Sequence, residues 1–298
     1  MTDLISKIQA LGVEWEQNLP LYKHSSFHIG GAADLAVFPT SSDALCRVLA
    51  VLRKQDLPVL VIGNGSNVVF ADEGYRGVVV FTGKCREITI NDGTVCADAG
   101  VSLSALASRV RDESLSGLEF AFGIPGTLGG AVYMNAGAYG GSMSDVCIKT
   151  EYYDLETGKV SRLCEGEQCF GYRTSIYQKH PERIILGATL KLQKGDREAI
   201  SKTMSAYKEK RQATQPLDKP NAGSVFKRPE GYFAGKLIED CGLKGLTVGG
   251  AQVSQKHAGF IVNVGGATCE DVKRLIDQIK TTVLQQTGVE LECEIRFL

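Results

Sequence analysis

The segment from Gly123 to Gly141 constrains the fold of this chain more than any other feature. Seven of its nineteen residues are glycine, and apolar residues such as Ile124, Leu128 and Val132 stand between them. Glycine permits positive φ and lets a ligand approach the main chain without meeting a Cβ. A run of such positions beside a short apolar stretch predicts backbone N–H groups that face an anion near a helix start. The segment therefore predicts a packed cradle, with a diphosphate as its natural guest.

A second glycine turn, from Gly63 to Asn67, follows an expected buried strand at residues 58–63. Taken alone, this turn is as typical of a structural tight turn as of a ligand site. Together, the two segments could hold a diphosphate from both sides, because strand ends that feed glycine turns are common ligand cradles. Neither segment has the spacing of a P-loop or of a dinucleotide-binding GxGxxG, which argues against both of those sites.

Bulk composition excludes several classes of protein. Hydrophobic residues make up 43% and charged residues 22%, and the formal net charge is −1, so no electrostatic footprint for nucleic acid or an anionic membrane is present. The N-terminal residues carry acids early and lack a signal-peptide core, and no window approaches the roughly 18 apolar residues of a membrane helix. We expect a cytoplasmic protein with no nucleic-acid or membrane partner.

The cysteines do not form a metal or disulfide pattern. There are nine, an odd number at irregular spacing without a CxxC, and only four histidines. We therefore expect no metal site and reduced, mostly buried thiols.

Alternating helical and strand patterns with several hairpins predict an α+β protein of two parts, with a boundary near residues 200–215. The patterns predict helices at 3–17, 45–52, 101–115, 195–212, 233–241 and 270–286, a hairpin around 91–93 and a final strand at 290–298. Ser41 and Ser42 are expected to cap the helix with apolar positions at 45–52, and Asp196 the helix that leads into the boundary.

Several motifs together resemble a known family. GNGSN at 63–67 and SGLEFAFGIPGTLGGAVYMNAGAYG at 116–140 are similar to the FAD-binding half of vanillyl-alcohol-oxidase-type flavoproteins. FGYRTS at 170–175, NAGSVFKRP at 221–229, GGAQVSQKHAGF at 249–260 and ECEIR at 292–296 resemble the UDP-N-acetylenolpyruvoylglucosamine reductase family. The resemblance runs from about Ser25 to Leu298.

This resemblance implies a two-part FAD-binding domain of the PCMH type at residues 1–205. A C-terminal α/β substrate-binding domain follows at 206–298, with a last strand that returns to the active site. The cofactor implied is FAD. We expect it to be bound non-covalently, because no obvious His or Cys for covalent attachment stands next to the glycine motifs; His28, before Gly30, is the one residue worth testing. The residues implied to bind it are Gly63, Asn64, Gly65, Ser66, Asn67, Gly123, Pro125, Gly126, Thr127, Gly129, Gly130, Ala131, Asn135 and Ala136.

The family reaction is implied to pass a hydride from NADPH to FAD and then to UDP-N-acetylglucosamine enolpyruvate. Hydride addition to that alkene requires donors or cations at the adjacent carboxylate and a proton for the α-carbon. By resemblance, Ser224 donates the proton, while Arg173 and Glu294 assist the developing charge. Strand alternation places Glu292 on the same side as Glu294, so the choice between them rests on the motif.

Substrate-binding residues are implied less sharply. They are Tyr172, Asn221, Lys227, Lys236 and His257, although surface lysine is the ordinary interpretation for the two lysines. The chain after Tyr177 is short, so we identify the subtype that lacks a tyrosine-bearing loop over the substrate. We expect a monomer.

Two other functions stay open at this point. One is an oxidase or dehydrogenase of the same fold, for which the motifs of the C-terminal half would have no purpose. The other is a non-catalytic flavin- or nucleotide-sugar-binding module, against which the joint presence of Arg173, Ser224 and Glu294 argues.

Overall fold

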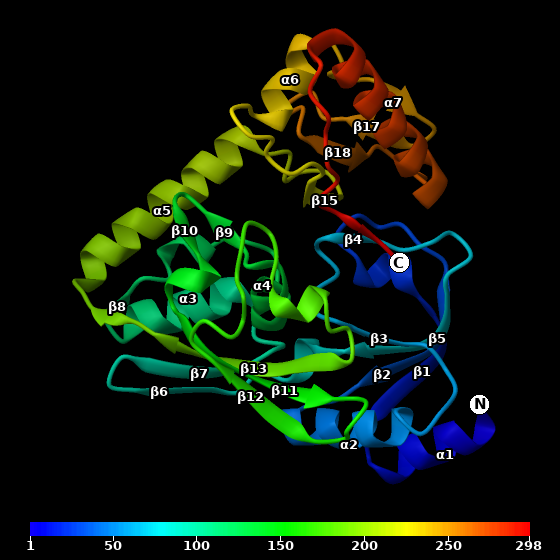
Figure 1. The fold of residues 1–298 in the computed structure, drawn as a ribbon, viewed down its shortest axis with the longest axis vertical. Helices are drawn as coiled ribbons and strands as arrows, with labels where there is room; N and C mark the ends of the chain where they lie inside the picture. Colours follow the sequence, from blue (N-terminus) through cyan, green and yellow to red (C-terminus); the bar gives the residue numbers. More distant parts are fainter. The chain divides into compact units, whose positions relative to one another are not determined.

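The structure, a computed structural model, describes all residues from 1 to 298 (Figure 1). The helices are α1 (Thr2–Ala10), α2 (Ser42–Leu52), α3 (Leu103–Asp112), α4 (Leu128–Met134), α5 (Arg197–Thr214), α6 (Ala234–Asp240) and α7 (Cys269–Thr287). The strands of the first half are β1 (Glu14–Pro20), β2 (Ala32–Phe38), β3 (Val59–Ile62), β4 (Val68–Val69), β5 (Tyr75–Phe81), β6 (Ile88–Asn91), β7 (Thr94–Asp98), β8 (Leu115–Ser116), β9 (Gly137–Ala138) and β10 (Gly141–Ser142). The remaining strands are β11 (Cys147–Asp154), β12 (Val160–Cys164), β13 (Arg183–Lys191), β14 (Gln193–Lys194), β15 (Asn221–Ser224), β16 (Thr247–Val248), β17 (Ala251–Val253), β18 (Phe260–Asn263) and β19 (Arg296–Phe297).

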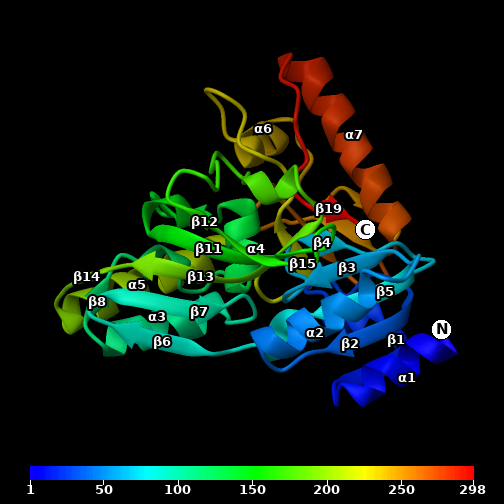
Figure 2. The same ribbon diagram turned by 60° about the horizontal axis from the view of Figure 1, so that its bottom comes forward.

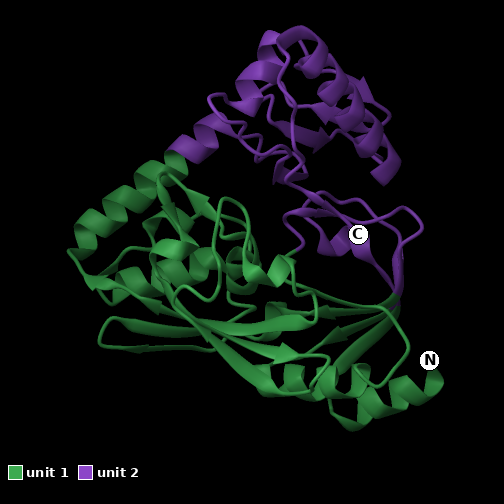
Figure 3. Cartoon of the chain, in the orientation of Figure 1, with its two compact units in different colours: residues 1–17, 35–64, 77–209 green, residues 18–34, 65–76, 210–298 purple.

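The chain divides into two compact units that are interleaved in sequence (Figure 3). The first unit contains residues 1–17, 35–64 and 77–209, and the second contains 18–34, 65–76 and 210–298. Strands β1, β2 and β5 and helix α5 each begin in one unit and end in the other. The predicted domains, by contrast, are two continuous stretches, 1–205 and 206–298. This division into domains stays a prediction.

One core of the first unit lies between a sheet and its helices (Figure 2). The sheet has the order β1-β2-β5-β3, with β3 parallel to β5. Helix α2 begins at its N-cap Ser41, whose side chain accepts the N–H of Ala44 at 3.1 Å. Its apolar residues Leu45 and Val48 then recur on one face and pack with residues of α1, β2 and β5.

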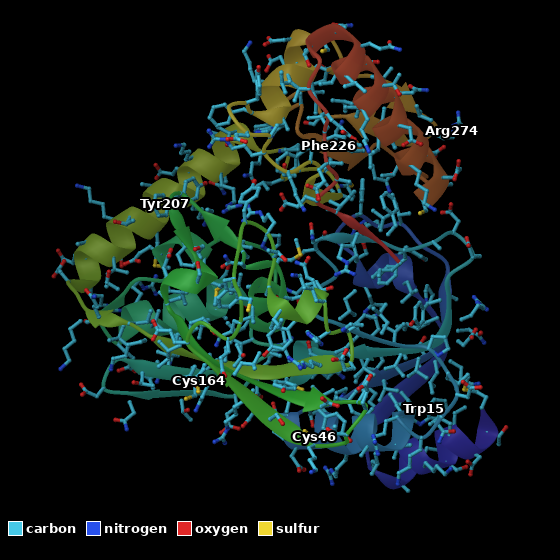
Figure 4. All side chains as sticks on the ribbon, viewed as in Figure 1. Trp15, Cys46, Cys164, Tyr207, Phe226 and Arg274 are labelled. Carbon is cyan, nitrogen blue, oxygen red and sulfur yellow. The ribbon has the colours of Figure 1, made fainter.

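The second core of this unit positions the glycine-rich segment. A five-stranded antiparallel sheet has the order β12-β11-β13-β7-β6. Side chains of β7 and β13 pack with those of α3 and α4, including the fully buried Leu106, Leu128 and Val132. The hairpin β9–β10 is also fixed, because Tyr139 stacks on Tyr207 of α5 (labelled in Figure 4) with ring centroids 4.2 Å apart. The glycine-rich segment is therefore built into the core.

The second unit is formed around an antiparallel sheet with the order β15-β18-β17-β16 and the helices α6 and α7. Its core also takes in Phe27, Ile29 and Val69, which come from the first quarter of the chain. Strand β19 adds to β4 in parallel, with Arg296 opposite Val68. None of the helices combines the length and the apolar character that crossing a membrane requires.

Most predicted elements are present, and three expectations are corrected. The first helix ends at Ala10, because the chain turns at Gly12 (φ +68°) before β1 begins. The final strand is reduced to Arg296–Phe297, preceded by a single bridge between Phe226 and Cys293. All nine cysteines are free, but only three are buried and three are exposed, so "mostly buried" was wrong.

Candidate active site

The first two residues of the Gly63–Asn67 turn lie against the Gly123–Gly141 segment within the first unit. Gly63 follows β3, and a Cβ at this position would lie 2.2 Å from Oγ1 of Thr127. Beside it, the side-chain amide of Asn64 donates to the carbonyl oxygen of Pro125 at 2.9 Å. Segments sixty residues apart in sequence are thus in direct contact, and the contact requires glycine at position 63. That they hold a diphosphate between them stays a prediction.

The N–H groups available to an anion lie outside helix α4, just before its first residue and in the neighbouring Gly63–Asn67 turn. Within the helix, the N–H groups of Leu128 and Gly129 donate to the carbonyl groups of Val101 and Ala99, each at 2.8 Å. The N–H of Gly130 donates to the side chain of Thr127, the N-cap, at 3.5 Å. None of the hydrogen bonds of the structure uses the backbone N–H of Asn64, Gly126 or Thr127. Unused N–H groups beside a glycine turn form the kind of concavity that binds phosphate. A diphosphate could therefore accept hydrogen bonds at the turn that precedes α4, rather than at the first turn of the helix.

Other members of the predicted cofactor set have structural partners. A Cβ at Gly129 would lie 2.8 Å from Cβ of Ala99, so this glycine permits close packing. Ala131 is buried in the core, and the N–H of Ala136 donates to its carbonyl at 2.8 Å. Gly123 has a positive φ of 83° and donates to the Ser104 hydroxyl at 3.0 Å. These residues shape the cradle through the fold.

The side chain of Asn135 also forms hydrogen bonds within the protein. It ends α4 in the left-handed conformation (φ +43°) and is 7% exposed. Its side chain donates to the carbonyl of Gly171 at 2.9 Å and accepts the N–H of Ser144 at 2.9 Å. Its amide group thus joins the end of α4 to the turn that carries Arg173.

The remainder of the Gly63–Asn67 turn, residues 65–67, belongs to the second unit. A Cβ at Gly65 would lie 2.3 Å from the carbonyl oxygen of His24. The carbonyl of Asn67 accepts the N–H of Arg296 at 3.0 Å, and its side chain donates to the carbonyl of Glu294 at 3.4 Å. Ser66, between them, is half-buried. This turn therefore fixes the terminal segment that carries Glu294.

Ser224 and Glu294 are brought together in the second unit. Ser224 ends β15 after an irregularity in its pairing with β18, next to Gly223 with a φ of +82°. The N–H of Glu294 donates to the carbonyl of Val225 at 2.7 Å, so the two residues occupy neighbouring positions on adjacent segments. The Ser224 hydroxyl donates to the carbonyl of Phe226 at 3.3 Å.

The predicted substrate-binding residues of this unit differ in their surroundings. The Asn221 side chain bonds the carbonyls of Pro216 and Lys219 and the N–H of Gly223, so it shapes the turn before Ser224. Lys227 pairs with Glu292, and the exposed Lys236 pairs with Asp240 one turn along α6; these are ordinary ion pairs.

His257 is placed as a neutral hydrogen-bonding group. Burial lowers its pKa below the usual 6.5, so the imidazole is uncharged at pH 7. Its Nδ1 accepts the N–H of Gly259 at 3.1 Å, which leaves the proton on Nε2. The ring could therefore donate to a ligand but would not act as a cation.

Tyr172 and Arg173 form the tip of a two-residue turn in the first unit. Gly171 and Thr174 close it with backbone bonds of 3.0 and 3.3 Å. Tyr172 is exposed, and the Arg173 guanidinium lies 5.4 Å from its ring centroid. Arg173 Nη2 also donates to the carbonyl of Gly137 at 3.2 Å, within the glycine-rich segment.

The residues that support this turn were missed at the sequence level. Ser175 and Gln178 both donate to the carbonyl of Tyr133 in α4, at 2.8 and 3.1 Å. The only signal was their place in a polar break after Arg173. Tyr177, in the same break, is a core residue: it is 1% exposed and its hydroxyl lies 2.6 Å from that of Thr150. No group of three or more His, Cys, Asp or Glu side chains is placed to hold a metal ion.

Comparisons with known proteins match both halves of the chain. A family model for the C-terminal domain of UDP-N-acetylenolpyruvoylglucosamine reductase matches residues 215–298, and one for an FAD binding domain matches residues 33–163. The enzyme of that name from Caldanaerobacter subterraneus subsp. tengcongensis is 48% identical over 281 residues, covering 94% of this chain and 92% of the relative. The one from Pediococcus pentosaceus is 44% identical over 298 residues, covering 100% and 97%.

Solved structures agree. The crystal structure of UDP-N-acetylenolpyruvylglucosamine reductase (MurB) from Thermus caldophilus matches with a TM-score of 0.79 and 34% identity, covering 96% of this chain and 98% of the other. An alkyldihydroxyacetonephosphate synthase matches 65% of this chain and 44% of its own with a TM-score of 0.51 and 17% identity, which shows the shared fold alone. With both glycine turns, the FGYRTS turn and the Ser224 and Glu294 segments in place, and with relatives at this identity over nearly the whole length, the chain belongs to the UDP-N-acetylenolpyruvoylglucosamine reductase family.

Proposed function

We propose that this protein reduces UDP-N-acetylglucosamine enolpyruvate to UDP-N-acetylmuramate, a peptidoglycan precursor, with FAD as cofactor and NADPH as the source of the hydride. The observation that carries the proposal is the 44–48% identity to reductases of this name over 94–100% of the chain. We further propose that it acts in the cytoplasm as a monomer. A same-fold oxidase is disfavoured because the C-terminal reductase model also matches.

The flavin would be held non-covalently at the paired glycine turns. The unused N–H groups of Asn64, Gly126 and Thr127 would donate to its diphosphate. When bound, FAD would supply the redox chemistry, which is transfer of a hydride from NADPH to the β-carbon of the enolpyruvyl group. Every other requirement of the reaction falls on side chains of this chain.

Those requirements arise at the substrate carboxylate and the α-carbon. As the alkene takes up the hydride, negative charge spreads to the carboxylate, where the Arg173 guanidinium can bind it bidentately. Glu294 can assist only as a protonated donor, because an ionised carboxylate would repel the same charge. Ser224 gives its hydroxyl proton to the α-carbon and recovers one from solvent. Serine is a weak acid, so this step requires the strongly basic carbon that the enolate provides.

A purified sample tests the function directly. The protein should be yellow, NADPH should bleach the flavin, and UDP-N-acetylglucosamine enolpyruvate should restore the colour. A colourless protein that cannot be reconstituted with FAD would contradict the proposal. If NADPH bleaches the flavin but the enolpyruvyl substrate does not restore its colour, the protein is a flavoprotein with a different acceptor.

Ser224→Ala separates the two half-reactions. Flavin reduction by NADPH should proceed at the wild-type rate, because the hydroxyl takes no part in it. Reoxidation by the enolpyruvyl substrate should slow by about 10²–10⁴, the range typical for losing a general acid. Stopped-flow absorbance follows both steps. An equal loss in both would show that Ser224 is structural.

A further inference from the structure

Arg173 occupies a backbone conformation that its residue type disfavours. Its φ is +56°, in the left-handed region where a Cβ crowds the following carbonyl and where glycine or asparagine is usual. It stands at the second tip position of the turn closed by Gly171 and Thr174. Such strain persists only where the surrounding structure fixes it, and it concentrates at functional sites. The groups that hold this turn therefore also determine where the guanidinium lies.

Two side-chain amides hold the turn, one at Arg173 and the other at Gly171. Nε2 of Gln178 donates to the carbonyl oxygen of Arg173 at 3.0 Å and to that of Tyr133 at 3.1 Å. A primary amide has two hydrogens, one for each of these carbonyl groups; the same nitrogen also lies 3.5 Å from Sδ of Met134, next to Tyr133 in α4. Asn135 donates to the carbonyl of Gly171 at 2.9 Å. The backbone of Arg173 is thereby joined to the C-terminal end of α4.

The far end of the arginine is fixed to the same segment. Its Nη2 donates to the carbonyl of Gly137 at 3.2 Å, two residues beyond Asn135. The segment Gly123–Gly141 thus provides the flavin cradle at one end and anchors both the backbone and the guanidinium of Arg173 at the other. Gln178 is the residue that joins the strained backbone to this segment.

We propose that Gln178 is a positioning residue for Arg173, holding its left-handed backbone against the end of α4 so that the guanidinium stays in place to bind the substrate carboxylate. This inference rests on the proposed function, in which Arg173 binds that carboxylate. Gln178 acts through Arg173 and does not touch the substrate.

The test compares half-reactions in the flavin-loaded enzyme. Gln178→Ala should leave flavin reduction by NADPH unchanged and slow reoxidation by the enolpyruvyl substrate by about 10–10²-fold, since small misplacements of a catalytic group have effects of this size. In an Arg173→Ala background the same change should have no further effect, because no guanidinium is left to position. Gln55→Ala is the matched control: its amide bonds only the carbonyl of Val51, at 3.5 Å.

An isosteric variant adds a pH signature. In Gln178→Glu, an ionised carboxylate would face two carbonyl oxygens with no hydrogen to donate, whereas the protonated acid can donate one. Its reoxidation rate relative to wild type should therefore rise as the pH falls. Hydrogen–deuterium exchange gives a readout without turnover: Gln178→Ala should speed exchange of the Gly171 and Thr174 amides, and Gln55→Ala should not.

The outcomes distinguish the two proposals. A wild-type enzyme whose reduced flavin is not reoxidised by the enolpyruvyl substrate contradicts the proposed function, while the exchange measurement still tests the Gln178 contact. A slow Arg173→Ala enzyme beside a full-rate Gln178→Ala enzyme overturns the positioning role. An undiminished loss in the Arg173→Ala background also overturns it, because Gln178 would then act on the fold in general.

Discussion

Gly63 and Arg173 show how a single residue type decides the geometry of the site. Gly63 does not have a positive φ; it is required for space, since Thr127 fills the volume where a Cβ would lie. Arg173 is the reverse, a long side chain where the backbone favours glycine. Both residues therefore meet requirements that the sequence alone does not reveal: close approach at one position, and a functional side chain in a strained turn at the other.

The requirement at Gly63 predicts a specific failure. In Gly63→Ala the new methyl would lie 2.2 Å from Thr127 Oγ1, and Thr127 cannot move away because it is buried and caps α4. We expect a loss of about 1–3 kcal/mol of unfolding free energy, typical of overpacking, together with a lower flavin content. Thermal unfolding and the visible spectrum measure the two effects.

Gly83→Ala is the matched control for this substitution. A Cβ at Gly83 meets no atom within 4 Å, and its φ is not positive, so stability and flavin content should be unchanged. Wild-type behaviour of Gly63→Ala would mean that the two glycine turns are not packed as described.

At the scale of elements, the sequence predicted what depends on local chemistry. Helix α2 follows from its Ser41 cap and apolar periodicity, and α5 from Asp196, which accepts the N–H of Ala199 at 2.8 Å. The hairpin β6–β7 follows from Asp92 and Gly93, both with positive φ. The length of α1 did not follow, because its apolar pattern runs on to Val13, past the turn at Gly12 (φ +68°) that separates the helix from β1.

The site divides in the same way. The glycine turns could be inferred from residue type, whereas the roles of Ser224, Arg173 and Glu294 came from the family resemblance and stay predictions. Gln178 could not be foreseen, because its function depends on joining Arg173 to the carbonyl group of Tyr133, which lies 45 residues away in the chain. Contacts of this kind exist only after the helix and the turn have packed.

Helix α7 gives a prediction at the element scale. Asp271 accepts the N–H groups of Thr268 and Gly250, each at 3.1 Å, and Thr268 caps the N–H of Asp271 at 3.0 Å. These bonds, chiefly that from Gly250, lower the pKa of Asp271 below its usual 3.8. Since the folded pKa is depressed, its stabilisation is present above pH 3.8 and is lost as the pH falls through the folded pKa.

Asp271→Ala should therefore lower the free energy of unfolding by about 1 kcal/mol at pH 7. The difference from wild type should shrink as the pH falls below 3.8. Urea unfolding across a pH series measures it. Asp277→Ala, exposed in the middle of the same helix, should have little effect at any pH. A difference for Asp271→Ala that is independent of pH would contradict the role of its charge.

At the scale of the whole molecule, the two compact units are not the two halves of the sequence. The second unit requires Phe27, Ile29 and Val69 in its core, and each is at most 1% exposed. It also requires β4 as the partner of β19. A stretch that begins at residue 206 lacks all of these, although it contains the C-terminal family match at 215–298.

A fragment of residues 206–298 tests which division governs folding. Removing three buried apolar side chains leaves cavities that typically cost 2–5 kcal/mol each, which is comparable to the 5–15 kcal/mol stability of a whole domain. We therefore expect the isolated fragment to lack a cooperative thermal transition and to give poorly dispersed amide NMR signals, with the full chain as the folded control. Cooperative unfolding of the fragment would instead show that the continuous division at 205/206 describes the folding units, and that Phe27, Ile29 and Val69 only cover a core that is stable without them.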